Sequence, residues 1–420
     1  MQEILAIWRD LMDQGAHCLA QEKYAEAEDL FAQSVVLAEQ LAIPEYLAFS
    51  LRLLATSHAH QRIWHTAEEG FQRALAICQE INNSKGLAEA WAGLASVAVG
   101  RGDLELAIQF YHKAINIYPF HSPRLRLGML HSDLGQVYLA LKQWDKAKDA
   151  YGIAKELCQS HGFQKGEGEI EVLLGEAHFM EGLEDDARDC FRRACQIFAQ
   201  ILDFHALATA LQYLAFLYYD REDWARAEEC QRRAVLLWLN QACISEASES
   251  TYFLSKIEQG AGEINEAEQH LELSLLLYDK KDLGLALRLQ SMALLALAQQ
   301  DAARAEEYFR DALYWFEQLE DEARAGEVYG ALAFLADAEG REQDALAFHK
   351  LSLEKLNGCG IALFALQRLA ENSEKRHNYL DSLNYYWQAL QLARDCDLEV
   401  EPIEQAIQRI SKKVRRKNKK

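Results

Sequence analysis

The sequence predicts an all-α solenoid of about ten helical hairpins followed by a capping helix. Three observations support this fold class: a period of about 40 residues, apolar residues at helical spacing, and glycines where turns are needed. A period of this length is typical of repeat proteins, in which each unit packs on its neighbours in the chain. We therefore expect a solenoid over residues 1–395, a linker and capping helix over 396–414, and a basic tail over 409–420.

A column of small residues defines the repeat. Its members are Ala27, Ala67, Ala107, Ala147, Ala187, Ala227, Ala267, Ala305, Ala345 and Ser382, at intervals of 40 six times and then of 38, 40 and 37. Small residues also stand twelve positions before and seven after each of them, as Gly135 and Ala154 do around Ala147. Small side chains let two helices cross closely, so each repeat should be a pair of packed helices.

Each helix and its turn can be recognised separately from these columns. In repeat 6, apolar side chains fall at i, i+3, i+4 and i+7, the stripe of an amphipathic helix: Leu211, Leu214, Ala215 and Tyr218. Four glycines stand five residues before the small column, where a helix ends most readily: Gly102, Gly182, Gly262 and Gly340. With two short turns per repeat, about 17 residues remain for each helix, or roughly 25 Å.

The capping helix is predicted after Pro402. Its apolar residues fall on one face at helical spacing: Ile403, Ala406, Ile407, Ile410 and Val414. Proline suits the first turn of a helix because its missing N–H would have no partner there. A solenoid needs such a helix to cover the apolar face of its last repeat.

These columns together resemble the tetratricopeptide repeat family over residues 1 to about 395. Repeat 4 carries the whole signature in Leu134, Gly135, Tyr138, Ala147, Tyr151 and Ala154. The 40-residue period is similar to the longer subclass found in kinesin light chains, Inscuteable-binding polarity adaptors and bacterial peptide-sensing regulators. The resemblance implies a right-handed superhelix whose first helices line a concave groove. It also implies a non-catalytic adaptor or scaffold that binds a peptide or helix of a partner protein there.

The resemblance indicates which residues face this groove. Repeat 3 would supply a smooth shelf of Ala92, Ser96 and Val99, whereas repeats 4 to 7 would supply an aromatic floor with mainly acidic neighbours. The predicted partner-binding residues are Gln136, Glu169, Glu176, Gln212, Tyr213, Phe216, Tyr219, Tyr252 and Lys256. Such a surface suits an apolar or basic segment. The alternative is that tight packing of the repeats buries these rings.

Composition and motifs favour binding over catalysis. The formal net charge is -21, which argues against nucleic acid or anionic lipid as a partner of the whole surface. No catalytic or nucleotide-binding motif stands in a suitable context, so we expect no enzyme activity, no cofactor and no metal site. His58 occupies the position of Tyr138 in another repeat and is predicted to lie in the core. Nine scattered cysteines favour reduced thiols, and the N-terminus lacks a signal peptide, so we expect a cytoplasmic protein.

The C-terminal tail is the exception to the acidic surface. Its last twelve residues contain no acidic residue and eight cations: Arg409, Lys412, Lys413, Arg415, Arg416, Lys417, Lys419 and Lys420. Four interpretations remain open: a solvated tail, docking on the chain's own acidic surface, binding to anionic lipid, and binding to nucleic acid. Two alternative functions follow: a peptide-controlled regulator, and an accessory protein that binds nucleic acid or an anionic membrane through the tail.

Overall fold

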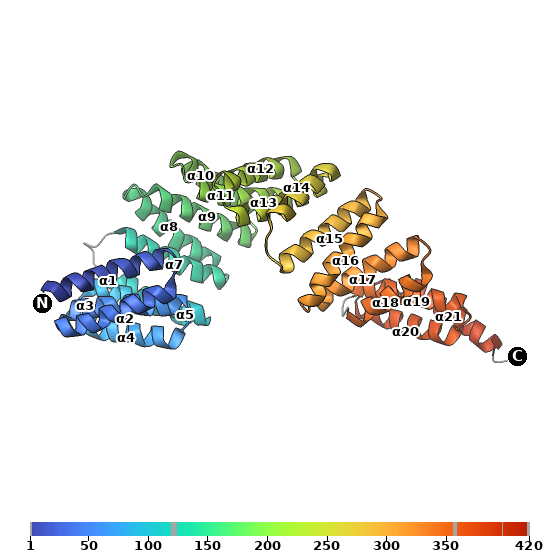
Figure 1. The fold of residues 1–420 in the computed structure, drawn as a ribbon, viewed down its shortest axis with the longest axis horizontal. Coiled ribbons are helices and arrows are strands. Elements are labelled where there is room, and N and C mark those ends of the chain that lie inside the picture. Colours follow the sequence, from blue (N-terminus) through green and yellow to red (C-terminus); the bar gives the residue numbers. More distant parts are fainter. Residues whose placement is uncertain (1, 119–123, 356–358, 397, 418–420) are drawn as a thin grey trace. The chain divides into compact units, whose positions relative to one another are not determined.

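The computed structural model describes residues 2–118, 124–355, 359–396 and 398–417. Within these residues the chain forms 21 helices and no strand, so the predicted all-α fold is confirmed (Figure 1). The chain divides into two compact units, residues 1–217 and 218–420, each described here by itself. The division falls within α11, Phe204–Asp220.

The first unit consists of consecutive helical hairpins. Its helices before α11 are α1 Gln2–Ala20, α2 Tyr24–Leu41, α3 Pro44–His60, α4 Trp64–Glu80, α5 Ser84–Arg101, α6 Leu104–Ile117, α7 Arg124–Ala140, α8 Trp144–Ser160, α9 Gln164–Glu181 and α10 Glu184–Gln200. Each odd-numbered helix from α1 to α9 packs on the helix that follows it. Each of these hairpins corresponds to one predicted repeat.

The second unit continues the same arrangement. Its helices are α12 Trp224–Asn240, α13 Ile244–Ala261, α14 Ile264–Leu277, α15 Leu283–Ala298, α16 Ala302–Gln318, α17 Glu322–Ala338, α18 Glu342–Lys355, α19 Cys359–Lys375, α20 Tyr379–Asp395 and α21 Glu401–Lys417. Here α13 to α20 form four hairpins, and α21 packs on α20.

The small columns lie where the two helices of a hairpin touch. Ala147 is completely buried, and Gly135 faces the ring of Tyr151 across the hairpin. A Cβ atom on Gly135 would lie 2.5 Å from Cε1 of Tyr151, well inside van der Waals contact. The close approach of these two helices therefore requires a residue without a side chain.

The turns between helices place one residue in the left-handed region. The four predicted glycines have φ between 75° and 88°, which confirms them as helix ends: Gly102, Gly182, Gly262 and Gly340. Glycine adopts this conformation without a steric cost, whereas other residues pay roughly 1–2 kcal/mol. Leu202 takes the same conformation, with φ 57°.

The 38-residue interval has a structural counterpart between α14 and α15. Helix α14 ends early, at Leu277, and the buried Arg288 of α15 packs beside the shortened connection. Its guanidinium carbon lies 4.0 Å from the ring centre of Tyr278, and its Nη2 lies 2.9 Å from a carboxylate oxygen of Glu249. The ring and the carboxylate together offset the cost of burying this cation.

Helix α21 covers the end of the second unit, as predicted. Ile403, Ile407 and Ile410 are buried against the hairpin of α19 and α20. The helix continues to Lys417, so residues 409–417 extend the capping helix. None of the helices that the structure describes is both long enough and apolar enough to span a bilayer.

Candidate functional site

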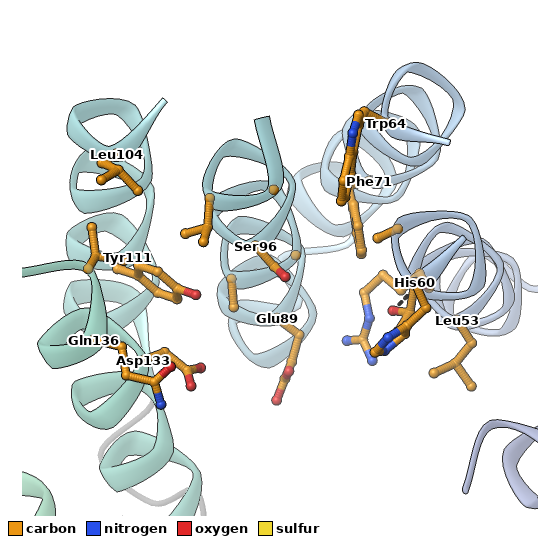
Figure 2. A pocket seen from close by; sticks show the side chains of 18 of the residues that line it. Leu53, His60, Trp64, Phe71, Glu89, Ser96, Leu104, Tyr111, Asp133 and Gln136 are labelled. Atoms are coloured by element: carbon orange, nitrogen blue, oxygen red, sulfur yellow. Dashed lines mark hydrogen bonds between the residues drawn. The ribbon is translucent and has the colours of Figure 1, made fainter. Parts of the chain in front are cut away.

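The first helices of the repeats line two adjoining pockets in the first unit. The N-terminal pocket has a volume of about 770 Å³ and lies along α3, α5 and α7 (Figure 2). The central pocket has a volume of about 600 Å³ and lies along α7, α9 and α11. Asp133 and Gln136 of α7 line both pockets, so the two form one groove.

The N-terminal pocket contains the shelf expected from repeat 3. Ala92, Ser96 and Val99 of α5 all line it. In Figure 2, Leu53 of α3 and Asp133 of α7 border the opening on opposite sides of this shelf. The residues that the repeat pattern assigns to the inner face of α5 therefore do lie in a groove.

The central pocket brings together four of the nine predicted partner-binding residues: Gln136, Glu169, Glu176 and Tyr213. The ring of Tyr213 stacks on Phe191, with ring centres 5.1 Å apart and planes inclined by 9°. Burial, and then the hydrogen bond between its hydroxyl group and Glu176, raise the pKa of Tyr213. Tyr213 is thus held in place by packing on one side and a carboxylate on the other.

The two other predicted residues of the first unit lie on the same helix, α11. Gln212 is half-buried, and Phe216 is 48% exposed with its ring edge-on to Phe179 at 5.8 Å between centres. The remainder of this apolar stretch turns inward, since Leu211, Leu214 and Leu217 are buried. Packing between repeats therefore buries part of this apolar stretch, as the alternative predicted, whereas Phe216 remains accessible to a partner.

Tyr219, Tyr252 and Lys256 belong to the second unit. Tyr219 lies between Trp224 and Phe253, with both ring centres 5.4 Å away. The amine of Lys256 donates a hydrogen bond of 2.8 Å to the Ser291 hydroxyl. Burial lowers the pKa of Lys256. Tyr219 lies on α11, Tyr252 and Lys256 lie on α13, and none of the three lines either of the two pockets.

Four charged residues of the groove were not among the predicted partner-binding residues: Arg52, Glu89, Arg126 and Asp133. Arg126 donates to both carboxylate oxygens of Glu89. Its Nη2 lies 2.9 Å from Oε2, and its Nε lies 3.1 Å from Oε1. Burial lowers the pKa of Arg52 and raises that of Asp133. A search of the sequence for charged residues within two turns of the small residue on each first helix would have found Arg52 and Glu89.

The described part of the basic tail contacts its own unit. Arg409 Nη2 lies 2.8 Å and Lys413 Nζ 2.6 Å from the carboxylate of Glu374 on α19. Lys412 is exposed. The remaining tail cations have side chains outside the described residues: Arg415, Arg416, Lys417, Lys419 and Lys420.

Histidines and cysteines add no second site. His58 is buried, as predicted, with Nε2 3.2 Å from Glu28. Within the described residues no three metal-ligating side chains come together. Cys396 is disulfide-bonded, so the expectation that all thiols are reduced is wrong for this residue. The scatter of cysteines along a sequence cannot show which of them the fold brings together.

Comparisons with known proteins agree with this geometry. Sequence models described as tetratricopeptide repeats match residues 46–119 and residues 207–239. No curated protein matches the sequence.

Many solved structures match this one, and two of them cover most of the chain. The apo form of RapI has a TM-score of 0.58 at 12% identity, covering 83% of this chain and 97% of that one. A signal transduction ATPase with numerous domains and a tetratricopeptide repeat sensor, from Pyrococcus horikoshii, has a TM-score of 0.57 at 15% identity. That alignment covers 78% of this chain and 52% of the ATPase, about half its length. At such low identity the likeness concerns the fold alone.

Proposed function

We propose that this protein is a non-catalytic adaptor that holds a peptide or helix of a partner protein in the groove of residues 1–217. The matches of residues 46–119 and 207–239 to sequence models of tetratricopeptide repeats support this proposal. Repeats of this kind generally act as scaffolds for protein interaction, and stacked repeats create extended concave surfaces for it. The observation that carries the proposal is the pair of adjoining pockets along the first helices.

The chemistry of the central pocket supports a partner segment with apolar and basic side chains. Met129, Ile170 and Phe198 supply apolar surface, while Glu169 and Glu176 supply negative charge. Apolar side chains of a partner would lose their water here, and a cation would find carboxylates beside them. This agrees with the partner class predicted from the sequence.

A blocked groove tests the proposal. Gln136 is exposed and lines both pockets, so Gln136→Trp should obstruct the groove without removing a core contact. Gln109→Trp is the matched control, because Gln109 is an exposed residue of α6 and lines neither pocket. Twelve-residue peptides displayed on phage are selected on the intact chain, and their binding to both variants is measured.

Enriched peptides should bind the control variant as well as the unaltered chain and should lose at least tenfold in affinity for Gln136→Trp. The proposal would be refuted if no peptide were enriched, or if the enriched peptides bound both variants equally. Circular dichroism of the two variants shows whether each remains folded.

The two alternative functions predicted from the sequence would give different experimental results. A peptide-controlled regulator would also show ligand-dependent changes elsewhere in the chain, which hydrogen exchange with a selected peptide would detect. An accessory protein acting through the basic tail would bind anionic vesicles or nucleic acid, with an affinity that falls steeply as salt rises. The cytoplasmic location stays a prediction.

A further inference from the structure

We propose that the groove takes an extended partner segment with two charges of opposite sign: a side-chain carboxylate against Arg52 and, a few residues away, a lysine or arginine against Asp133 and Glu169. This inference rests on the proposed function and specifies the chemistry of the partner. It follows from the order of charged groups along the first helices.

The first step is that this fold pairs the charges that it buries. Glu171 of α9 is only 1% exposed, and its two oxygens contact Lys155 Nζ at 2.5 Å and Arg193 Nη2 at 3.0 Å. Glu258 of α13 is completely buried and contacts Arg232 at 3.1 Å. Burial of an unpaired charge is costly, so such pairing is the expected solution.

Two half-buried charged groups of the groove, Arg52 and Asp133, depart from this rule, and an exposed carboxylate, Glu169, lies in the same groove. Within the part of the chain that the structure describes, the charged ends of Arg52, Asp133 and Glu169 form no hydrogen bond or ion pair, although Arg52 lies 5.4 Å from the ring centre of Phe49. Burial shifts the pKa of all three towards the neutral form. Arg52 and Asp133 are therefore partly removed from water without an opposite charge in direct contact. Glu89 acts on Arg52 and Arg126 acts on Asp133 only from a distance, so a partner's charge in direct contact would add to them.

The second step is the order of these groups. Arg52 of α3 lines the N-terminal pocket, Asp133 of α7 lines both pockets, and Glu169 of α9 lines the central pocket. The groove thus presents a cation at one end and two carboxylates towards the other. The intervening charges, Glu89 and Arg126, bind each other, and this pair also acts from a distance on Arg52 and Asp133.

The third step is the distance that a ligand must span. Arg52 and Asp133 line the same pocket, and Arg126 of α7 is close enough to act electrostatically on both of them. An extended peptide advances about 3.3 Å per residue, so a few residues connect the two charges. Leu53, Phe71 and Leu104 line the same pocket, which favours apolar residues in the bound segment.

The carboxylate should come from an internal Asp or Glu residue of the partner. Arg52 and Glu89 also line a third pocket, of about 440 Å³, that extends past them to Trp8 and Tyr46. The groove is therefore open beyond Arg52, and a bound chain can continue in that direction. A terminal carboxylate would leave this part of the groove empty.

The test is a double-mutant cycle on the leading peptide from the phage selection. We expect the enriched peptides to carry Asp or Glu a few positions from Lys or Arg. Arg52→Met should weaken binding of the unaltered peptide about tenfold and leave binding of its Glu→Gln (or Asp→Asn) form unchanged. Asp133→Asn should likewise weaken binding of the unaltered peptide and leave unchanged the binding of a peptide whose Lys or Arg is replaced by Met. Arg52→Glu should restore binding to a peptide with Lys at the acidic position.

Two further measurements keep the outcomes distinct. Arg52→Met and Asp133→Asn remove unpaired, partly buried charges, so their melting temperatures should be equal to or higher than that of the unaltered chain. If the binding of the peptides is weakened by Gln136→Trp but the peptides lack this pair of opposite charges, or if the cycles show no coupling, this inference is wrong while the proposed function stands. If Gln136→Trp weakens the binding of no peptide, the proposed function itself is wrong.

Discussion

Glu171→Gln is the most direct test of the idea that the fold pairs its buried charges. Glu171 lies on α9 with 1% of its side chain exposed, and it contacts both Lys155 and Arg193. The glutamine has the same shape but no charge, so both cations would lose their counter-ion and would face an amide group. The change thus removes an interaction and leaves the packing volume intact.

The magnitude follows from the exposure of the two partners. Removing one partner of a fully buried pair costs about 3–5 kcal/mol. Here the side chains of Lys155 and Arg193 are 26% and 48% exposed, so water can solvate them again and the cost is smaller. We expect a loss of about 2 kcal/mol, discounted for this solvent screening. For a unit of about 200 residues this corresponds to a fall in melting temperature of about 4–8 °C.

Urea unfolding followed by circular dichroism measures the change. Glu156→Gln on α8 is the control, because Glu156 is exposed and its replacement should alter stability by less than about 0.5 kcal/mol. Changing Lys155 to methionine together with Glu171→Gln should recover part of the loss, since an apolar replacement of a buried pair is often tolerated. A Glu171→Gln variant as stable as the control, or more stable, would refute the reasoning.

Three other predictions concern separate parts of the chain. Burial lowers the pKa of His178 below its ordinary value near 6.5. The unfolded chain therefore binds a proton at His178 more readily than the folded chain does, and stability is lost as pH falls through about 6.5. His178→Tyr, which copies Tyr138 of another repeat, should reduce the difference in melting temperature between pH 7.5 and 5.5, and an unchanged difference would contradict this. Ile410→Ala should cost about 2–4 kcal/mol because the side chain is completely buried, and hydrogen exchange should accelerate in α20 and α21 before other helices. Leu202→Gly should raise stability by about 0.5 kcal/mol in urea unfolding, because a 67% exposed leucine holds a left-handed conformation there, and a loss of stability would show that the turn is not strained.

The fold could be predicted from the sequence because its cause is local and repeated. Small residues such as Ala147 recur at one interval, and only close helix crossing explains a small side chain at every copy. The left-handed glycines and the apolar stripe of α21 were likewise predictable from neighbours a few residues away. Leu202 shows the limit of this approach, because a leucine gives no signal of the conformation that its turn imposes.

The candidate site was predictable only in part. The resemblance to tetratricopeptide repeats predicted Glu169, Glu176 and Tyr213 as groove residues, and all three line one pocket. The division of the chain within α11 separates them from Tyr252 and Lys256, although periodicity treats all repeats alike.

By itself, the sequence determined the repeat and the helical hairpins. Those properties depend on a pattern that recurs about every 40 residues and on residues a few positions apart within each helix, which the chain order already records. The tertiary structure decided which buried charges find a partner, such as Glu171, and which do not, such as Asp133. Pairing depends on the positions of side chains from different repeats, and a difference of a few ångströms separates an ion pair from an unpaired charge that a ligand can bind.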